Sequence, residues 1–311
     1  MAHIDLPLYN KCNNCCLMCT NPTDFFSETN FSYYLQKNFL ERLKKINPKD
    51  LNEISLTGGE PTLHPDFFEI LDFIKKHFPK SNITLLTNGR RFYYINFAKN
   101  LWRHKNISIA VSLLGHNAIT HDAITGTKGS FKQTISGLKN LIFTKIDKSQ
   151  KIEIRVIACR LNLRFIPKII KFLKDKFLIV DRVVLIFMEY EGQAIVNKKQ
   201  VAITYKDIFP VLNQIKKGIL AFREFRLYHF PLFVLEPYFW PYVWRTLPAE
   251  EISFLPECRK CALKKHCLGI HKGYLKYVKK PEIQPRLSLE GIKIEETGNF
   301  YKPINSVYEK N

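Results

Sequence analysis

Residues 12–19 read Cys-Asn-Asn-Cys-Cys-Leu-Met-Cys, and residues 57–62 read Thr-Gly-Gly-Glu-Pro-Thr. Three thiolates spaced C-x3-C-x2-C can ligate three irons of a four-iron cluster, which leaves the fourth iron open to a substrate or cofactor. Two consecutive glycines after a strand let the backbone approach a ligand that a side chain would exclude. Together the two segments predict an iron–sulfur site beside a ligand-binding loop.

The choice of ligands among the four N-terminal cysteines stays open on spacing alone. Cys12, Cys16 and Cys19 form C-x3-C-x2-C, whereas Cys12, Cys15 and Cys19 form C-x2-C-x3-C. A structural zinc site is an alternative, but it usually takes four ligands in two close pairs, and the nearest histidines are poorly spaced for it. A disulfide is a further alternative, although adjacent cysteines suit a reducing compartment better.

The composition is typical of a globular protein that binds metal in a reducing compartment. A chain of 311 residues can bury a large core, and we expect one large domain with a small appendage. Seven of the eight cysteines lie within 12–19 and 258–267, which favours metal binding over a secreted disulfide scaffold. No signal peptide and no apolar run of membrane-spanning length is found. We therefore expect a soluble, cytoplasmic protein without a membrane partner.

The net charge of +20 is compatible with binding to a polyanionic partner such as RNA. The basic residues are spread along the chain in pairs, among them Lys44-Lys45 and Lys75-Lys76, rather than gathered in one segment. Such pairs are typical of solvated helix and loop surfaces. Nucleic acid is therefore the less favoured partner, and a moderately acidic peptide also fits the charge.

Short β-branched runs alternate with amphipathic stretches, a pattern typical of a parallel sheet with crossover helices. Six strands are predicted at 4–8, 52–56, 83–86, 107–113, 151–158 and 183–187, and helices at 34–46, 66–78, 91–103, 130–145 and 167–177. Six units are too few for a closed eight-stranded barrel of about 250 residues. We expect an α/β fold: a partial (β/α)6 barrel at 1–225, a small cysteine-containing C-terminal extension at 226–280, and a tail at 281–311.

The motifs fall at the ends of the predicted strands. The cysteine loop follows the first strand, Gly58-Gly59-Glu60 ends the second, Asn88 follows the third, and Ser112 ends the fourth. In a β/α barrel, the chemistry gathers where the strands end at their C-termini. All of these candidates are therefore expected on one face of the barrel.

On these two motifs the sequence resembles the radical S-adenosylmethionine (SAM) superfamily, over most of the chain. That family places a bulky residue directly before the last cysteine ligand, and Met18 stands there. The resemblance therefore implies that Cys12, Cys16 and Cys19 bind a [4Fe-4S] cluster. It also implies reductive cleavage of SAM to a 5′-deoxyadenosyl radical, with an electron donor such as a flavodoxin or ferredoxin.

The same resemblance implies a SAM site along the strand ends. The Gly-Gly-Glu loop would hold the methionine end of SAM, whose amino group would pair with backbone or Glu60 acceptors. Arg155 would meet the SAM carboxylate, or else form an ordinary buried ion pair with Glu153. No side chain is assigned as catalytic. The SAM contacts expected in this way are Gly58, Gly59, Glu60, Asn88, Ser112 and Arg155.

A second cysteine group, Cys258, Cys261 and Cys267, forms C-x2-C-x5-C near the C-terminus. A zinc site closed by His266 or His271 is one interpretation. An auxiliary iron–sulfur cluster is the other, because extended radical SAM enzymes often carry a cysteine-rich segment at a similar place. We expect these three cysteines to be metal ligands.

A finer resemblance bears on the substrate. Segments 56–63, 86–90 and 121–126 are similar to peptide-modifying radical SAM maturases, and segment 255–269 to the maturase of the His-Xaa-Ser repeat system, although the match departs after Gly269. This implies a ribosomally synthesised peptide as substrate. One alternative is a radical SAM enzyme that acts on RNA or a nucleotide; the molybdopterin-pathway cyclases end in Gly-Gly, whereas this chain ends in Glu-Lys-Asn. The other is a non-catalytic iron–sulfur electron-transfer protein.

Overall fold

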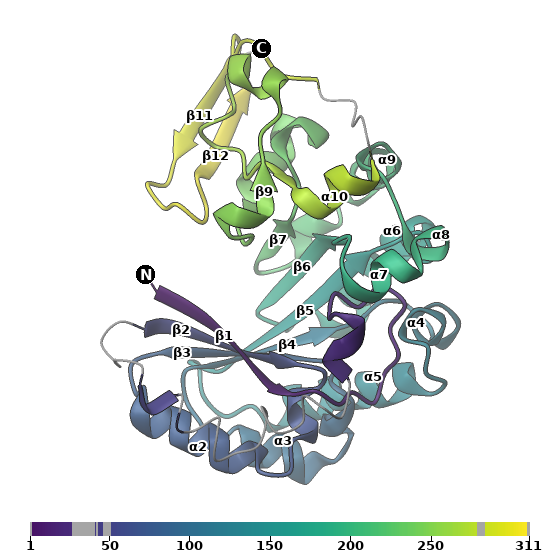
Figure 1. Ribbon diagram of the computed structural model, residues 1–311, viewed down its shortest axis with the longest axis vertical. Coiled ribbons are helices and arrows are strands. Elements are labelled where there is room, and N and C mark those ends of the chain that lie inside the picture. Colours follow the sequence, from purple (N-terminus) through teal and green to yellow (C-terminus); the bar gives the residue numbers. More distant parts are fainter. Residues whose placement is uncertain (1, 27–40, 42, 46–50, 279–283, 310–311) are drawn as a thin grey trace.

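A computed structural model of the chain describes residues 2–26, 41, 43–45, 51–278 and 284–309. A parallel sheet of eight strands, each paired with its sequence neighbours, curls through the middle of the molecule (Figure 1). Its strands are β1 (Ala2–Tyr9), β2 (Leu51–Gly58), β3 (Asn82–Thr87), β4 (Ile107–Ser112), β5 (Lys151–Ala158), β6 (Arg182–Phe187), β7 (Phe225–Tyr228) and β8 (Val243–Trp244). The sheet is an open, partial barrel.

Helices cover the convex face of this sheet because each carries an apolar stripe at helical spacing. In α5 (Ser130–Thr144) the buried stripe includes Leu138 and Leu141, and in α6 (Ile166–Phe177) it includes Ile169 and Leu173. The remaining longer helices are α2 (Phe67–His77), α3 (Ile95–Leu101), α4 (Ala118–Thr125) and α9 (Tyr205–Ile215). The main hydrophobic core therefore lies between the sheet and these helices.

The concave face of the sheet carries a different set of side chains. Ser112, Arg155, Val184 and Arg226 lie in register on four neighbouring strands, from β4 to β7. Val184 belongs to a small apolar cluster with Ile186 and Tyr228 that is separate from the main core. The inner surface of the partial barrel therefore combines charged groups on β5 and β7 with a small apolar cluster on β6 and β7.

The predicted fold class is confirmed, and all six predicted strands lie within two residues of those observed. The strand count of six was wrong, because β7 and β8 extend the sheet. These strands have four and two residues, too short for a periodic pattern to reveal. The helix predicted at 91–103 is interrupted, since Tyr94 is extended between a 3-10 turn and α3. The one predicted at 34–46 lies largely outside the described residues.

The C-terminal part contributes to the sheet and also forms small elements of its own. Beyond β7 and β8, β9 (Ile252–Ser253) pairs with β10 (Ile270–His271), and β11 (Ile292–Glu296) pairs with β12 (Ile304–Glu309). The division at residue 225 into core and extension stays a prediction, with the sheet continuing across it. None of the described helices is long and apolar enough to cross a membrane.

Candidate functional site

The cysteine loop leaves the C-terminal end of β1 and is pinned by the end of α4. The amide of Cys15 donates to the carbonyl of Thr125 at 2.8 Å, and that of Leu17 donates to the carbonyl of Ile124 at 2.9 Å. This backbone course leaves the Cys15 side chain exposed, whereas Cys12, Cys16 and Cys19 are all partly buried. The structure therefore distinguishes Cys15 from the other three thiols, which form the C-x3-C-x2-C set and are turned inward.

The three inward thiols share one electrostatic environment. Burial raises the pKa of Cys12 to about 11 and also raises the pKa of Cys19. Burial raises the pKa of Cys16 as well, and the nearby Cys12 and Cys19 add to that shift because neighbouring thiolates repel one another. A thiolate set of this kind needs an added positive centre to become stable, and the irons of a cluster would supply it.

Asn88, at the end of β3, contacts the cysteine loop directly. Its Nδ2 donates to Oδ1 of Asn13 at 2.7 Å and lies 3.9 Å from Sγ of Cys12, which also accepts from the amide of Asn14 at 3.4 Å. Hydrogen bonds to cluster sulfurs are one means by which proteins set a reduction potential. Asn88, expected as a SAM contact, lies here beside the thiol of Cys12.

Arg90 is a site residue that the sequence analysis did not single out. Its Nη1 donates to Oδ1 of Asn14 at 2.7 Å and to the carbonyl of Asn13, while its Nε donates to Oε1 of Gln133 at 2.7 Å. The guanidinium thus fastens the segment between the first two ligands to α5. The sequence feature that could have pointed to Arg90 is its position at the end of the Leu-Thr-Asn-Gly-Arg stretch, residues 86–90.

The two glycines after β2 are required by close contact with the cysteine loop. Gly58 has φ +130°, and a Cβ there would lie 2.4 Å from the carbonyl oxygen of Tyr9. A Cβ on Gly59 would lie 2.4 Å from the carbonyl oxygen of Lys11. The amide of Gly59 also donates to the Tyr9 carbonyl at 2.7 Å. Because no side chain fits between them, the two loops lie backbone against backbone.

Glu60 ties two loops together from a buried position. Its Oε1 accepts from the Thr62 hydroxyl at 2.6 Å, the Thr62 amide at 3.2 Å and the Thr87 hydroxyl at 2.7 Å. Its Oε2 accepts from the Asn88 amide at 2.7 Å. Burial raises the pKa of Glu60, and these hydrogen bonds oppose the rise. The carboxylate expected to receive the SAM amino group is therefore already bonded to the loops after β2 and β3.

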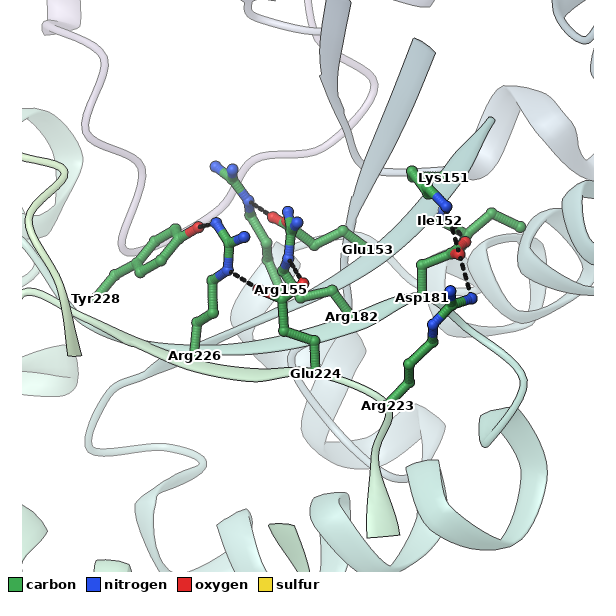
Figure 2. A network of polar contacts seen from close by, with 10 residues as sticks. All are labelled: Lys151, Ile152, Glu153, Arg155, Asp181, Arg182, Arg223, Glu224, Arg226 and Tyr228. Atoms are coloured by element: carbon green, nitrogen blue, oxygen red, sulfur yellow. Dashed lines mark hydrogen bonds and ion pairs between the residues drawn. The ribbon is translucent and has the colours of Figure 1, made fainter. Parts of the chain in front are cut away.

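Arg155, on the concave face beside Ser112, takes part in an ion-pair network along β5, β6 and β7 (Figure 2). Its Nε lies 2.5 Å from Glu153, whose other oxygen lies 2.7 Å from Arg182. The predicted Glu153 ion pair is therefore present. Figure 2 shows the terminal nitrogens of Arg155 pointing away from Glu153, so the same guanidinium still offers donors to a carboxylate.

Asp122 secures the turn between α4 and α5 that holds the cysteine loop. It accepts from the amides of Gly129 and Phe131 at 2.7 Å each and from the Ser130 hydroxyl at 2.8 Å. Burial would raise the pKa of Asp122, but these hydrogen bonds outweigh burial and lower it. The carboxylate therefore satisfies donors at the start of α5.

Asp122→Ala is expected to lower the free energy of unfolding by about 1–2 kcal/mol at pH 7. Because the folded-state pKa is lowered, this stabilisation is present above the unfolded pKa and is lost as the pH falls through the folded value. Thermal unfolding from pH 7 to pH 3 should show the two proteins converging in acid. Asp175→Ala, at an exposed i,i+4 pair with Lys171, is the control. A constant gap at all pH values would contradict this role.

Comparison with known proteins connects this geometry to a family. Residues 6–154, which contain the cysteine loop, the glycine pair, Asn88 and Ser112, match the family model of the radical SAM superfamily. The chain carries a radical SAM domain. The C-terminal ends of β1 to β4, with the cysteine loop, the glycine pair, Asn88 and Ser112, all lie within this domain.

Three proteins illustrate the likeness. Mycofactocin maturase MftC of Mycobacterium tuberculosis is 30% identical over 130 residues, covering 42% of this chain and 32% of MftC. GTP 3′,8-cyclase of Pasteurella multocida is 29% identical over 179 residues, covering 56% of this chain and 50% of the cyclase. Streptococcus suis SuiB, solved bound to the precursor peptide SuiA, has a TM-score of 0.57 at 15% identity, covering 72% of this chain and 48% of SuiB. The SuiB likeness concerns the fold, and the matched part spans half or less of each protein.

The second cysteine group lies beyond the matched radical SAM domain. Cys258, Cys261 and Cys267 line one cavity whose other walls are mainly apolar. Sγ of Cys267 accepts from the amides of Leu232 and Gly269, each at 3.4 Å. Two amides that donate to a half-buried sulfur are an environment suited to a thiolate ligand.

The histidines proposed as a fourth ligand face elsewhere. His266 Nε2 lies 3.6 Å from a carboxylate oxygen of Glu296, and His271 Nε2 lies 3.2 Å from one of Glu191. Neither lines the cavity with the cysteines. In the described part of the chain, no three His, Cys, Asp or Glu side chains are arranged to hold a single metal ion. The structure therefore places neither histidine as a fourth ligand beside the three thiols.

Proposed function

We propose that this chain is a radical SAM enzyme that binds a [4Fe-4S] cluster through Cys12, Cys16 and Cys19 and modifies a peptide. The observation that carries the proposal is the inward trio of thiols, with Cys15 turned outward, inside a radical SAM domain. When bound, the cluster and SAM would supply a 5′-deoxyadenosyl radical that abstracts hydrogen from the substrate. A non-catalytic electron carrier would not need the SAM-facing strand ends.

The residues of the chain would hold and orient these groups. The Gly58-Gly59 backbone and Asn88 border the thiols, and Arg155 offers free guanidinium donors to the carboxylate of SAM. Glu60 and Arg90 would act indirectly, by fixing the loops that carry the ligands. The proposed SAM-binding set is Gly58, Gly59, Glu60, Asn88, Ser112 and Arg155.

The direct test is anaerobic reconstitution with iron and sulfide, reduction, and measurement of 5′-deoxyadenosine formed from SAM. We expect time-dependent formation that requires the reductant. An electron donor such as a flavodoxin or ferredoxin would replace the chemical reductant in a cytoplasmic setting. Absence of product from protein that carries a full complement of iron would reject the proposed activity.

A peptide is the favoured substrate class. The similarity to the maturase MftC and the fold shared with SuiB, which was solved with its precursor peptide, support it, and the concave face presents charged side chains from several strands (Figure 2). The His-Xaa-Ser type of substrate stays a prediction. A nucleotide is the second candidate because of the match to GTP 3′,8-cyclase. Stimulation of SAM cleavage by GTP but by no precursor peptide would favour the nucleotide.

We further propose that Cys258, Cys261 and Cys267 hold an auxiliary iron–sulfur cluster. The Cys267→Ala variant should lose about half of the iron of the reconstituted protein while keeping SAM cleavage without substrate. Iron and zinc content by elemental analysis is the measurement. Lys265→Ala, at an exposed neighbouring position, is the control. Unchanged iron in the Cys267 variant, or zinc in place of iron in the unaltered protein, would contradict the auxiliary cluster.

A further inference from the structure

Arg90 binds two neighbouring oxygens in the segment between the first two ligand cysteines. Its Nη1 donates to the carbonyl oxygen of Asn13 and, at 2.7 Å, to Oδ1 of Asn14. Its Nε donates to Oε1 of Gln133, on α5, at 2.7 Å. A guanidinium group carries donors and no acceptor. These contacts therefore decide which atoms of Asn13 and Asn14 face Arg90, and which atoms are turned away from it.

The peptide group between Asn13 and Asn14 is oriented by the first of these contacts. In a trans peptide group the carbonyl and the amide point in opposite directions, and the described chain has no cis peptide bond. With the Asn13 carbonyl on Arg90, the amide of Asn14 is directed to the other side. There it donates to Sγ of Cys12 at 3.4 Å. Arg90 therefore aims a backbone donor at the first ligand thiol.

The side-chain amide of Asn14 is oriented by the second contact. This side chain is buried, and only its oxygen can accept from the guanidinium, so its amide nitrogen is turned away from Arg90. Burial raises the pKa of the Cys16 thiol, and a hydrogen bond from the Asn14 side chain opposes that rise. Through one residue, Arg90 thus directs a donor to each of the first two ligand thiols.

The turn that carries Arg90 is itself held against α5. The amide of Arg90 donates to Oδ1 of Asn88 at 3.0 Å, and the carbonyl of Asn88 accepts from the Thr134 hydroxyl at 2.9 Å. A Cβ added to Gly137 would lie 2.2 Å from the carbonyl oxygen of Gly89, so the helix packs directly on this turn. Arg90 is therefore anchored through its backbone as well as through its side chain.

The positive charge of Arg90 is not neutralised by a carboxylate in the part of the chain that the structure describes. Its side chain bonds to carbonyl and amide oxygens, all of them neutral, and to no sulfur. Hydrogen bonds to the sulfurs and the net charge around a cluster both set its reduction potential. Donors and positive charge favour the more negative, reduced form, and an arrangement of this kind therefore raises the potential.

We propose that Arg90 is a positioning residue that sets the reduction potential of the N-terminal cluster by orienting the amide donors of Asn14 toward Cys12 and Cys16. The inference rests on the proposed function, because a cluster must occupy these thiols. Arg90 acts through Asn14, since its own side chain bonds to oxygen atoms. Its loss should make the cluster harder to reduce while the three ligand cysteines stay in place.

The test is a redox titration of the reconstituted full-length protein, followed by electron paramagnetic resonance and carried out without SAM. The background is the variant Cys258→Ala, Cys261→Ala, Cys267→Ala, so that only the N-terminal cluster contributes. Arg90→Gln should lower the equilibrium constant for one-electron reduction about tenfold, as for the loss of a hydrogen bond to a charged group, which corresponds to ~59 mV. Arg91→Gln, which removes the exposed arginine one position further on, should change it less than about twofold.

Two further variants separate orientation from charge. Arg90→Lys keeps the positive charge, but one ammonium does not reproduce the fork that holds both oxygens, so reduction should stay at least about threefold less favourable than in the background protein. Asn14→Ala removes the side-chain donor and should also lower the reduction constant about threefold. In the Asn14→Ala protein, Arg90→Gln should then have a smaller effect than in the presence of Asn14, because part of its action has already been removed.

Three results would each overturn the proposal: an unchanged potential in Arg90→Gln, full recovery in Arg90→Lys, or strictly additive effects of Arg90→Gln and Asn14→Ala. Should Arg90→Gln fail to fold, Asn14→Ala and Arg90→Lys take its place, and unchanged potentials in both would overturn it. The titration needs no SAM cleavage. A protein with the expected shifts that forms no 5′-deoxyadenosine would reject only the proposed activity, and SAM cleavage with unchanged potentials in the variants would reject only this inference.

Discussion

Cys16→Ala should abolish formation of 5′-deoxyadenosine, by at least about a hundredfold, while Cys15→Ala should retain most of it. The two cysteines are adjacent, but only Cys16 is turned inward with Cys12 and Cys19. Loss of Cys16 leaves two thiolates, too few to hold a cluster with a single open iron. Iron content, the absorbance of the reconstituted cluster and 5′-deoxyadenosine are the measurements.

The Cys15 variant is the matched control for this experiment. It removes a thiol one residue away on the same loop, and its backbone contact with Thr125 does not involve the side chain. Equal loss of iron in both variants would show that the loop, rather than the ligand, is responsible. Retention of activity in the Cys16 variant and its loss in the Cys15 variant would reverse the ligand assignment.

Glu60→Ala is expected to destabilise the chain by roughly 3–5 kcal/mol and to remove cluster binding. The carboxylate is 1% exposed and accepts four hydrogen bonds from Thr62, Thr87 and Asn88. Alanine leaves the two amides among these donors buried and without their acceptor. Denaturant unfolding monitored by circular dichroism gives the free energy, and iron content reports the site.

Two further variants separate the inter-loop role of Glu60 from a general effect of charge. Glu60→Gln keeps an acceptor oxygen and should recover part of both the stability and the iron content. Glu53→Ala removes an exposed glutamate from the same strand, β2, and should change the free energy of unfolding by less than about 0.5 kcal/mol. Similar unfolding free energies for Glu60→Ala and Glu53→Ala would contradict the role assigned to Glu60.

Much of the fold could be predicted from local patterns. Strands β3 to β6 are rich in β-branched residues, and helices such as α6 carry an apolar stripe of the expected period. Because parallel strands end on the same side of the sheet, the order of motifs along the chain was enough to predict that they share one face. The glycine pair was recognisable because only glycine tolerates such a close approach.

The parts that could not be predicted depend on contacts between distant segments. Nothing local indicates that Glu60 bonds to the amide of Asn88, or that Arg90 reaches back to Asn13. Strands as short as β7 and β8 have no periodicity of their own; β7 pairs with the edge of β6, and β8 pairs with β7. Glu189, His229 and His271 come near one another from the ends of three different strands, so no single stretch of sequence predicts their proximity.

The most direct test of the account is the Mössbauer spectrum of the reconstituted protein before and after SAM is added. The triple variant Cys258→Ala, Cys261→Ala, Cys267→Ala is used, so that only the N-terminal cluster contributes. The account predicts that about one quarter of the iron, the site without a cysteine ligand, changes its parameters when SAM binds. Iron sites that are all unaffected by SAM, or N-terminal thiolates that hold zinc instead of iron, would contradict it.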